Sequence, residues 1–129
     1  MNKDYMYIVA GDLMQDKFNK LYPDIHTIPF RENFSKGSYN EPFFNEEFIN
    51  NRCSVHNTTK DDYINKLDPI INLDFNKEYV LCFGEDECCK ENLKFMIKYL
   101  KNNNYKYVIR VNIVDEETLE LINEYIYSK

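Results

Sequence analysis

The sequence is short of the residues that build several common binding motifs. Its 129 residues include no tryptophan, three glycines and four prolines. Three glycines cannot form a Walker-type phosphate loop or a GxGxxG dinucleotide motif. No apolar run approaches the ~18 residues of a membrane span, and residues 1–5 lack the charged-then-apolar layout of a signal peptide. We therefore expect a cytoplasmic protein with no membrane partner.

Cysteine and histidine are also sparse, at four and two residues. They show no CxxC or HxxxH spacing, so we predict no metal site. Cys88 and Cys89 are neighbours, a geometry that rarely pairs, and four reduced thiols fit the cytoplasm. A nucleophilic cysteine would need His26 or His56 as its base, and we favour structural thiols instead.

Positive charge is in deficit, with 16 Lys and Arg against 22 Asp and Glu. The net charge of −6 argues against a nucleic-acid partner, because a phosphate backbone needs a basic surface. It allows a basic protein partner, although solubility alone is the favoured explanation. Apolar residues make up 43% of the chain, enough for the core of one domain over residues 1–129.

The best-defined pattern begins at residues 79–83, an unbroken apolar run typical of a strand buried on both faces. Gly84 ends the run, and Glu85 and Asp86 follow it. A helical stripe comes next, formed by Leu93, Met96, Ile97 and Leu100. Residues 5–10 form a second apolar run, which ends in the same way at Gly11 and Asp12.

The rest of the chain alternates predicted strands and helices. We expect a first helix that Asp12 caps and that ends near Tyr22, and then a strand at 25–28 that Pro29 ends or marks as an edge. Two helices should follow, one at 42–51 capped by Asn40 and one capped at Thr58 and Thr59. The chain should close with a strand at 105–113 and a final helix, which is capped by Asp115 and lined by Leu119, Ile122 and Ile126. This order predicts a three-layer α/β fold: a mostly parallel, Rossmann-like sheet of about four strands with flanking helices and a helical insert between strands two and three.

Three segments together resemble an uncharacterised bacterial family, the domain of unknown function numbered eighteen thirty-five. Residues 7–12 resemble its opening motif, Arg31-Glu32 followed by Gly37 resemble its middle motif, and residues 80–86 resemble its apolar strand with an acidic turn. Ser38 stands where the family usually has proline, and Gly84-Glu85 where many members have Glu-His. Longer members also carry a further C-terminal domain. The family has no established activity, so the resemblance implies a fold and candidate positions only.

In a parallel sheet, equivalent strand ends share one edge, where ligands bind. The candidate ligand-binding residues there are Gly11, Asp12, Arg31, Glu32, Gly37, Glu85 and Asp86. Carboxylates beside an arginine can bind a cation, exchange protons or hold a polar ligand. The structural alternative is that Asp12 and Asp86 are helix caps and that Arg31 and Glu32 form a surface pair.

Two functions stay open. The first is a domain that binds or acts on a small polar ligand, nucleotide-like, metal-phosphate-like or amino-acid-like, at this edge. The second is an acidic interaction protein, as a homodimer or a binder of a basic partner. One concave polar pocket would favour the first, and a flat apolar, tyrosine-rich face the second. The sequence does not identify a cofactor or a reaction.

Overall fold

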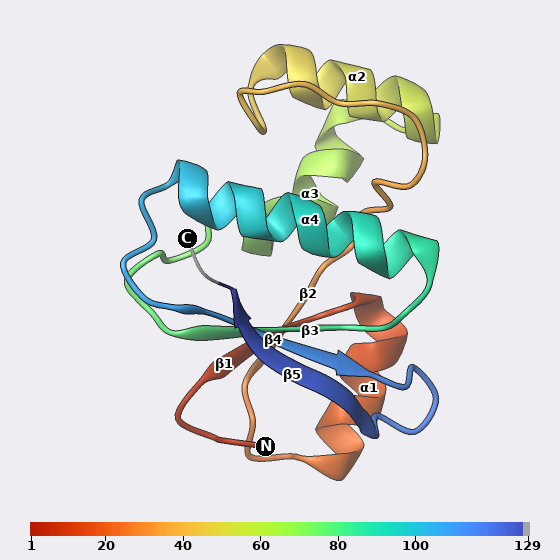
Figure 1. The fold of residues 1–129 in the computed structure, drawn as a ribbon. Coiled ribbons are helices and arrows are strands. Elements are labelled where there is room, and N and C mark those ends of the chain that lie inside the picture. The colour runs from red at the N-terminus through yellow and green to blue at the C-terminus, as the bar shows by residue number, and fades with distance from the viewer. Residues whose placement is uncertain (128–129) are drawn as a thin grey trace.

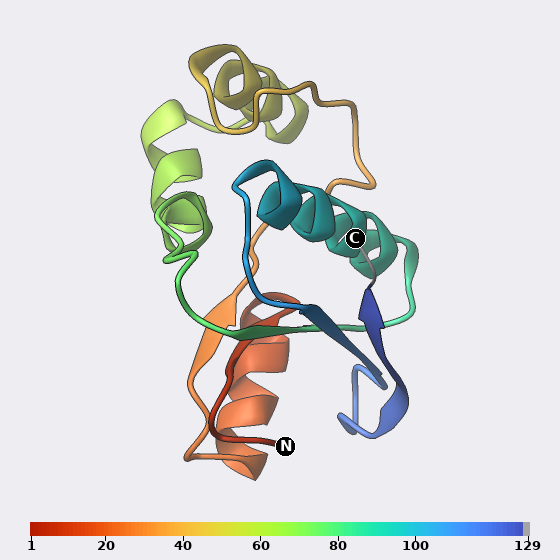
Figure 2. The ribbon, with the colours of Figure 1, turned by 60° about the vertical axis from the view of Figure 1, so that its left-hand side comes forward.

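The computed structural model describes residues 1–127. In chain order its elements are β1 (Met6–Val9), α1 (Gly11–Leu21), β2 (Thr27–Pro29), α2 (Glu46–His56), α3 (Lys60–Ile71), β3 (Tyr79–Phe83), α4 (Glu87–Asn102), β4 (Ile109–Val114) and β5 (Leu121–Tyr127). They form three layers, with the sheet between α1 on one side and α2, α3 and α4 on the other (Figures 1 and 2).

The sheet has the strand order β2-β1-β3-β4-β5. The first four strands run parallel, with Ile8 opposite Leu81 and Leu81 opposite Val111, and β5 pairs antiparallel with β4. The protein is therefore a three-layer α/β fold with a mostly parallel sheet, as the sequence predicts. The strands expected at residues 5–10, 79–83 and 105–113 are β1, β3 and β4, and they are neighbours in the sheet. β2, with Pro29, is an edge strand.

The apolar continuity of β3 follows from its place in the middle of the sheet. All five of its residues are buried, because helices cover both faces at this point. One core lies under α4 and the helical insert, and includes Leu81, Phe95 and Met96. The other lies between the sheet and α1, around Met14 and Phe18. No helix within residues 1–127 combines the length and apolar character needed to cross a bilayer.

The helical insert starts later than predicted. The helix expected at 42–51 is α2, and its cap is Asn45, whose side chain accepts a hydrogen bond from the Phe48 N–H at 2.8 Å. Asn40 does not cap it. Phe44 has φ of 62°, a left-handed conformation that excludes it from a right-handed helix. The next helix, α3, is capped by Thr59, as predicted.

The prediction of a final helix is wrong, since residues 121–127 form the strand β5. Ile122 and Ile126 are four residues apart, a spacing that places two side chains on one face of either a helix or a strand. Asp115 does accept backbone N–H groups, those of Glu117 and Thr118, but in a turn that returns the chain antiparallel. Leu119 has φ of 61°, which breaks any helix there. The sheet thus has five strands rather than about four.

Candidate functional site

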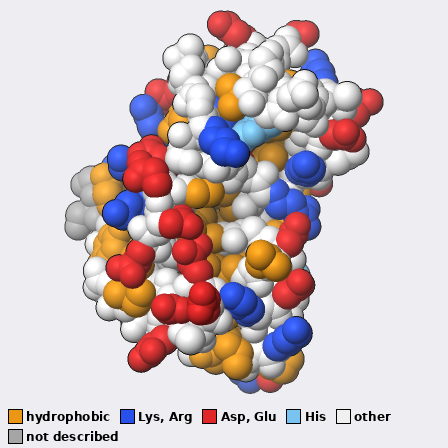
Figure 3. Space-filling model, turned by 90° about the vertical axis from the view of Figure 1, so that its right-hand side faces the viewer, with side chains coloured by type: hydrophobic (Ala, Val, Ile, Leu, Met, Phe, Trp, Pro, Cys, Tyr) orange, Lys and Arg blue, Asp and Glu red, His pale blue; other side chains and the backbone are white. Residues whose placement is uncertain are grey.

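A cavity of about 570 Å³ lies at the carboxyl edge of the parallel strands. Its walls come from the segments that follow β1, β2, β3 and β4 and from the helical insert. Figure 3 looks onto this edge and shows acidic side chains in a band along one side of a furrow, with Lys and Arg side chains mostly above and on the other side. Charged side chains from several segments thus meet apolar ones in one hollow at this edge.

Five of the seven candidate residues line this cavity: Gly11, Asp12, Arg31, Glu32 and Asp86. Four strand ends meet at one edge because the strands are parallel, and the loops that follow them meet there too. The topology therefore brings together candidate residues that are up to 75 positions apart in the sequence, from Gly11 to Asp86.

The other two candidates lie outside the cavity lining. Glu85 is exposed. Gly37 has φ of 65°, and a Cβ atom there would lie 2.6 Å from Cγ2 of Val55. Gly37 thus serves the packing of a tight loop against α2 rather than the cavity.

Asp12 does not cap α1. The N-cap position is Ala10, without a side-chain hydrogen bond, and α1 begins at Gly11. Instead the Asp12 carboxylate accepts a hydrogen bond from Nε of Arg31 at 2.8 Å. Arg31 therefore pairs across the cavity rim with Asp12, and the expected Arg31–Glu32 surface pair is not present.

Glu32 is a buried carboxylate with a complete set of donors. Arg52 donates to both of its oxygens, at 2.9 and 3.1 Å, and the Tyr63 hydroxyl and the Asn33 N–H donate as well. Burial opposes ionisation, but the hydrogen bonds from Arg52, Tyr63 and Asn33 outweigh it and hold the pKa of Glu32 below its usual range. Glu32 is thus a fixed negative charge in the wall of the cavity.

His56 connects this buried charge to the cavity. Its Nε2 contacts the Glu32 carboxylate, and its side chain is 25% exposed and lines the cavity. Within residues 1–127, Nδ1 of His56 makes no hydrogen bond to the protein. The same Nε2 lies 3.1 Å from a guanidinium nitrogen of Arg52, so the ring is held against the buried pair while Nδ1 remains available for a hydrogen bond to a bound molecule.

The sequence suggests a role for His56 only as a base for cysteine, and it gives no sign of Arg52 or Tyr63 as site residues. Arg52 lies one helical turn before His56, so both reach the same carboxylate. The expected helix ended at residue 51, and no local pattern connects either residue with Glu32. Only the packing of α2 and α3 over the end of β2 brings them together.

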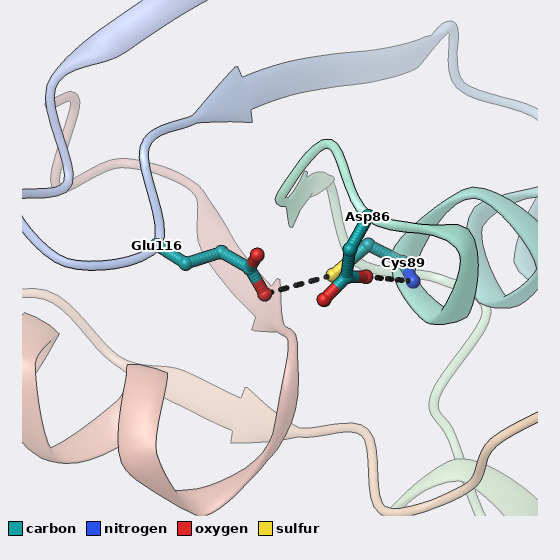
Figure 4. Close-up of side chains that lie close together, drawn as sticks. All are labelled: Asp86, Cys89 and Glu116. Carbon is teal, nitrogen blue, oxygen red and sulfur yellow. Dashed lines mark hydrogen bonds between the residues drawn. The ribbon is translucent and has the colours of Figure 1, made fainter.

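Asp86, Cys89 and Glu116 form another part of the cavity wall, where their side chains lie close together (Figure 4). Asp86 caps α4 by accepting the Cys89 N–H at 2.7 Å, and the Cys89 thiol donates to Glu116 at 3.5 Å. One ligand-type atom from each of the three side chains lies within 4.8 Å of the others. Burial and the nearby Asp86 carboxylate raise the pKa of Glu116, so this wall favours a proton or a cationic group.

The donor set suits an organic cation better than a metal ion. Burial raises the pKa of the Cys89 thiol, whereas a metal ligand must be a thiolate. One oxygen of Asp86 is already used to cap the helix. Glu116 reaches this place because Gly84 has no side chain: a Cβ atom on Gly84 would overlap Cγ of Glu116. Glu116 was missed because a helix was expected after Asp115.

We found no match to this chain among protein-family models, curated proteins or solved structures. The resemblance carried by residues 7–12, 31–37 and 80–86 therefore stays a prediction.

Proposed function

We propose that the protein binds a small polar molecule that carries both a cationic and an anionic group, such as an amino-acid-like zwitterion. The observation that carries this proposal is the cavity at the carboxyl edge, because its lining includes both acidic and basic side chains. A cavity of this size accommodates a metabolite-sized ligand.

The cationic group of the ligand would contact Asp86 and Glu116. Burial and, after it, the nearby Asp86 carboxylate raise the pKa of Glu116, and a bound cation relieves the repulsion between the two carboxylates. The anionic group would face Lys66, which lines the cavity and takes part in none of the ion pairs within residues 1–127. Arg31 is less available, since Asp12 already holds it.

A thermal-shift screen of amino acids, nucleotides with Mg²⁺, and small amines tests the proposal. A ligand at 100 times its Kd stabilises the native state by about 2.7 kcal/mol, enough to raise the Tm by several degrees. In Asp86→Asn the cap survives, because asparagine caps helices as well as aspartate does. We therefore expect this variant to lose the ligand-induced shift while its unliganded Tm stays near that of the parent protein.

Glu85→Gln is the matched control. It removes the same charge one residue away, from an exposed side chain outside the cavity lining. We expect it to keep the full ligand-induced shift. If Glu85→Gln loses the shift as Asp86→Asn does, general surface charge is responsible and the site is wrong. If Asp86→Asn retains the shift, the acidic wall does not bind the ligand.

We also propose a reducing compartment such as the cytoplasm as the protein's location. The four cysteines, all free, support this proposal.

A further inference from the structure

A second cavity, of about 930 Å³, is formed by other residues. Its lining comes from the N-terminal segment, β4, β5 and the turn between them. Val80, whose side chain belongs to the core on the α1 side of the sheet, also lines it, so the cavity lies on that face. Figure 2 shows α1 on this side of the sheet, beneath β1 and β2 and away from β5.

The most informative residue in this cavity is Arg110. Its guanidinium stacks on the ring of Tyr5, with Cζ 4.8 Å from the ring centre. Its Nε is buried and has no hydrogen-bond partner, and Arg110 takes part in none of the ion pairs within residues 1–127. A buried guanidinium donor without an acceptor costs free energy, which an anionic ligand would recover.

Asn112 is a second polar side chain without an adequate partner. It lies two residues after Arg110 on β4, on the same face, and only 8% of it is exposed. Its amide nitrogen is 3.9 Å from the Met1 sulfur, a weak acceptor, and its amide oxygen accepts no hydrogen bond from residues 1–127. Two neighbouring side chains that line one cavity thus both have polar atoms that no described residue bonds: Nε of Arg110 and the amide oxygen of Asn112.

The protein's own acids do not satisfy Arg110. Glu124 is opposite Asn112 in the β4–β5 register and also lines the cavity. It makes no ion pair with Arg110 within 4.0 Å. The fork of the guanidinium is therefore available to an anion from outside the chain.

Besides Arg110, Asn112 and Glu124, the lining holds one more acidic side chain, Glu120, and the amide of Asn2, and its other members are aromatic or apolar. Four tyrosines contribute to it: Tyr5, Tyr7, Tyr22 and Tyr125. Aromatic side chains pack well against flat rings. We propose that this cavity binds a planar aromatic anion, with its carboxylate or phosphate on Arg110, its polar edge at Asn112 and its ring among the tyrosines.

Titration of the ¹⁵N-labelled protein with phenyl phosphate and with benzoate, followed by NMR, tests the proposal. We expect saturable shifts of the Arg110 Nε–Hε resonance and of amides in β4 and β5, with the tighter of the two probes identifying phosphate or carboxylate as the preferred group. Arg110→Gln should raise the Kd of that probe at least tenfold, because a charge-assisted bidentate contact is lost. Lys106→Gln removes the same charge from a side chain just before β4 and outside the lining, and should leave the Kd unchanged.

Several results would overturn the proposal. One is a probe that shifts only resonances around Asp86, which would place it in the other cavity. Another is neutral benzyl alcohol binding as tightly as phenyl phosphate, which would show that no anion is needed. An equal Kd of the probe for Arg110→Gln and for the parent protein would show that Arg110 does not bind the anionic group. If the β4 and β5 resonances respond to protein concentration instead of to the probe, and sedimentation shows a dimer, a second copy covers the face.

Discussion

The buried pair of Arg52 and Glu32 gives the sharpest stability prediction. Both side chains are 0% exposed, and Arg52 also donates to the backbone carbonyls of Asn33, Lys36 and Ser38. Arg52→Met leaves a buried carboxylate without its counter-charge and removes donors from those three carbonyls. Breaking a buried ion pair by removing one partner costs about 3–5 kcal/mol. For a chain of this length that corresponds to a fall in Tm of roughly 10–20 °C.

Urea unfolding at pH 7, with the midpoint and slope both fitted, measures the loss. Lys60→Met is the matched control, since it removes a positive charge from the same helical insert. The Lys60–Glu46 pair is exposed and 3.8 Å long, so we expect almost no change in the free energy of unfolding. A cost of less than ~1 kcal/mol for Arg52→Met would refute the reasoning that the pair is buried and essential.

The pH dependence of the same measurement separates charge from packing. In the parent protein the pKa of Glu32 is lowered, so its contribution is complete above its unfolded pKa of about 4.3 and disappears as the pH falls through the folded value. In Arg52→Met the buried carboxyl keeps the desolvation and loses its main donor. Protonation of Glu32 then removes the buried, unpaired charge. The difference in unfolding free energy between Arg52→Met and the parent protein should therefore shrink as the pH falls from 7 toward 5. An electrostatic origin is contradicted if Arg52→Met loses the same free energy of unfolding at pH 7 and at pH 5. It is also contradicted if the Glu32→Gln/Arg52→Met double variant loses as much as the two single variants together.

Two further predictions concern packing and thiols. Gly37→Ala should lower the free energy of unfolding by about 1–3 kcal/mol, because φ is 65° and the new Cβ atom meets Val55. Adding Val55→Ala to this variant should recover only the steric part of the loss. An unchanged urea midpoint for Gly37→Ala would contradict the overlap. Burial raises the pKa of Cys82 to about 12, so at pH 8 a thiol reagent should modify Cys82 only after unfolding, and far more slowly than half-buried Cys53. Equal modification rates of Cys53 and Cys82 in the folded protein would refute the burial argument. The denatured, unreduced protein should titrate with four thiols, and a count of two would reveal a disulfide bond.

Much of the fold could be predicted because its central strands are marked by uninterrupted apolar runs. Residues 79–83 have no polar alternation, and β3 is buried on both faces. The errors lie where local pattern is ambiguous. Ile122 and Ile126 fit a helix or a strand equally well, and the pairing of β5 with β4 decides between them. At Asn40 and Asn45 two good capping residues compete, and the left-handed Phe44 selects the second.

The placement of the candidate site follows from topology more than from motifs. Asp12, Arg31 and Asp86 line one cavity because parallel strands end at a common edge. Glu116 follows the fourth strand by the same rule, but the wrong helix prediction concealed it. Tyr63 and Arg52 come from helices of the insert, and their approach to Glu32 depends on tertiary packing that no sequence spacing encodes.

The position of β5 at the end of the sheet has a consequence for self-association. One side of the strand pairs with β4, and the other presents unpaired backbone groups beside the exposed side chains of Leu121, Ile122 and Ile126. Such an edge is a template for intermolecular β-pairing. Glu124 lies at the middle of β5, so two copies pairing antiparallel about their centres would bring two carboxylates face to face. We therefore expect this single acidic residue to disfavour edge-to-edge pairing of β5 between copies, as charged residues among apolar strand positions do in general.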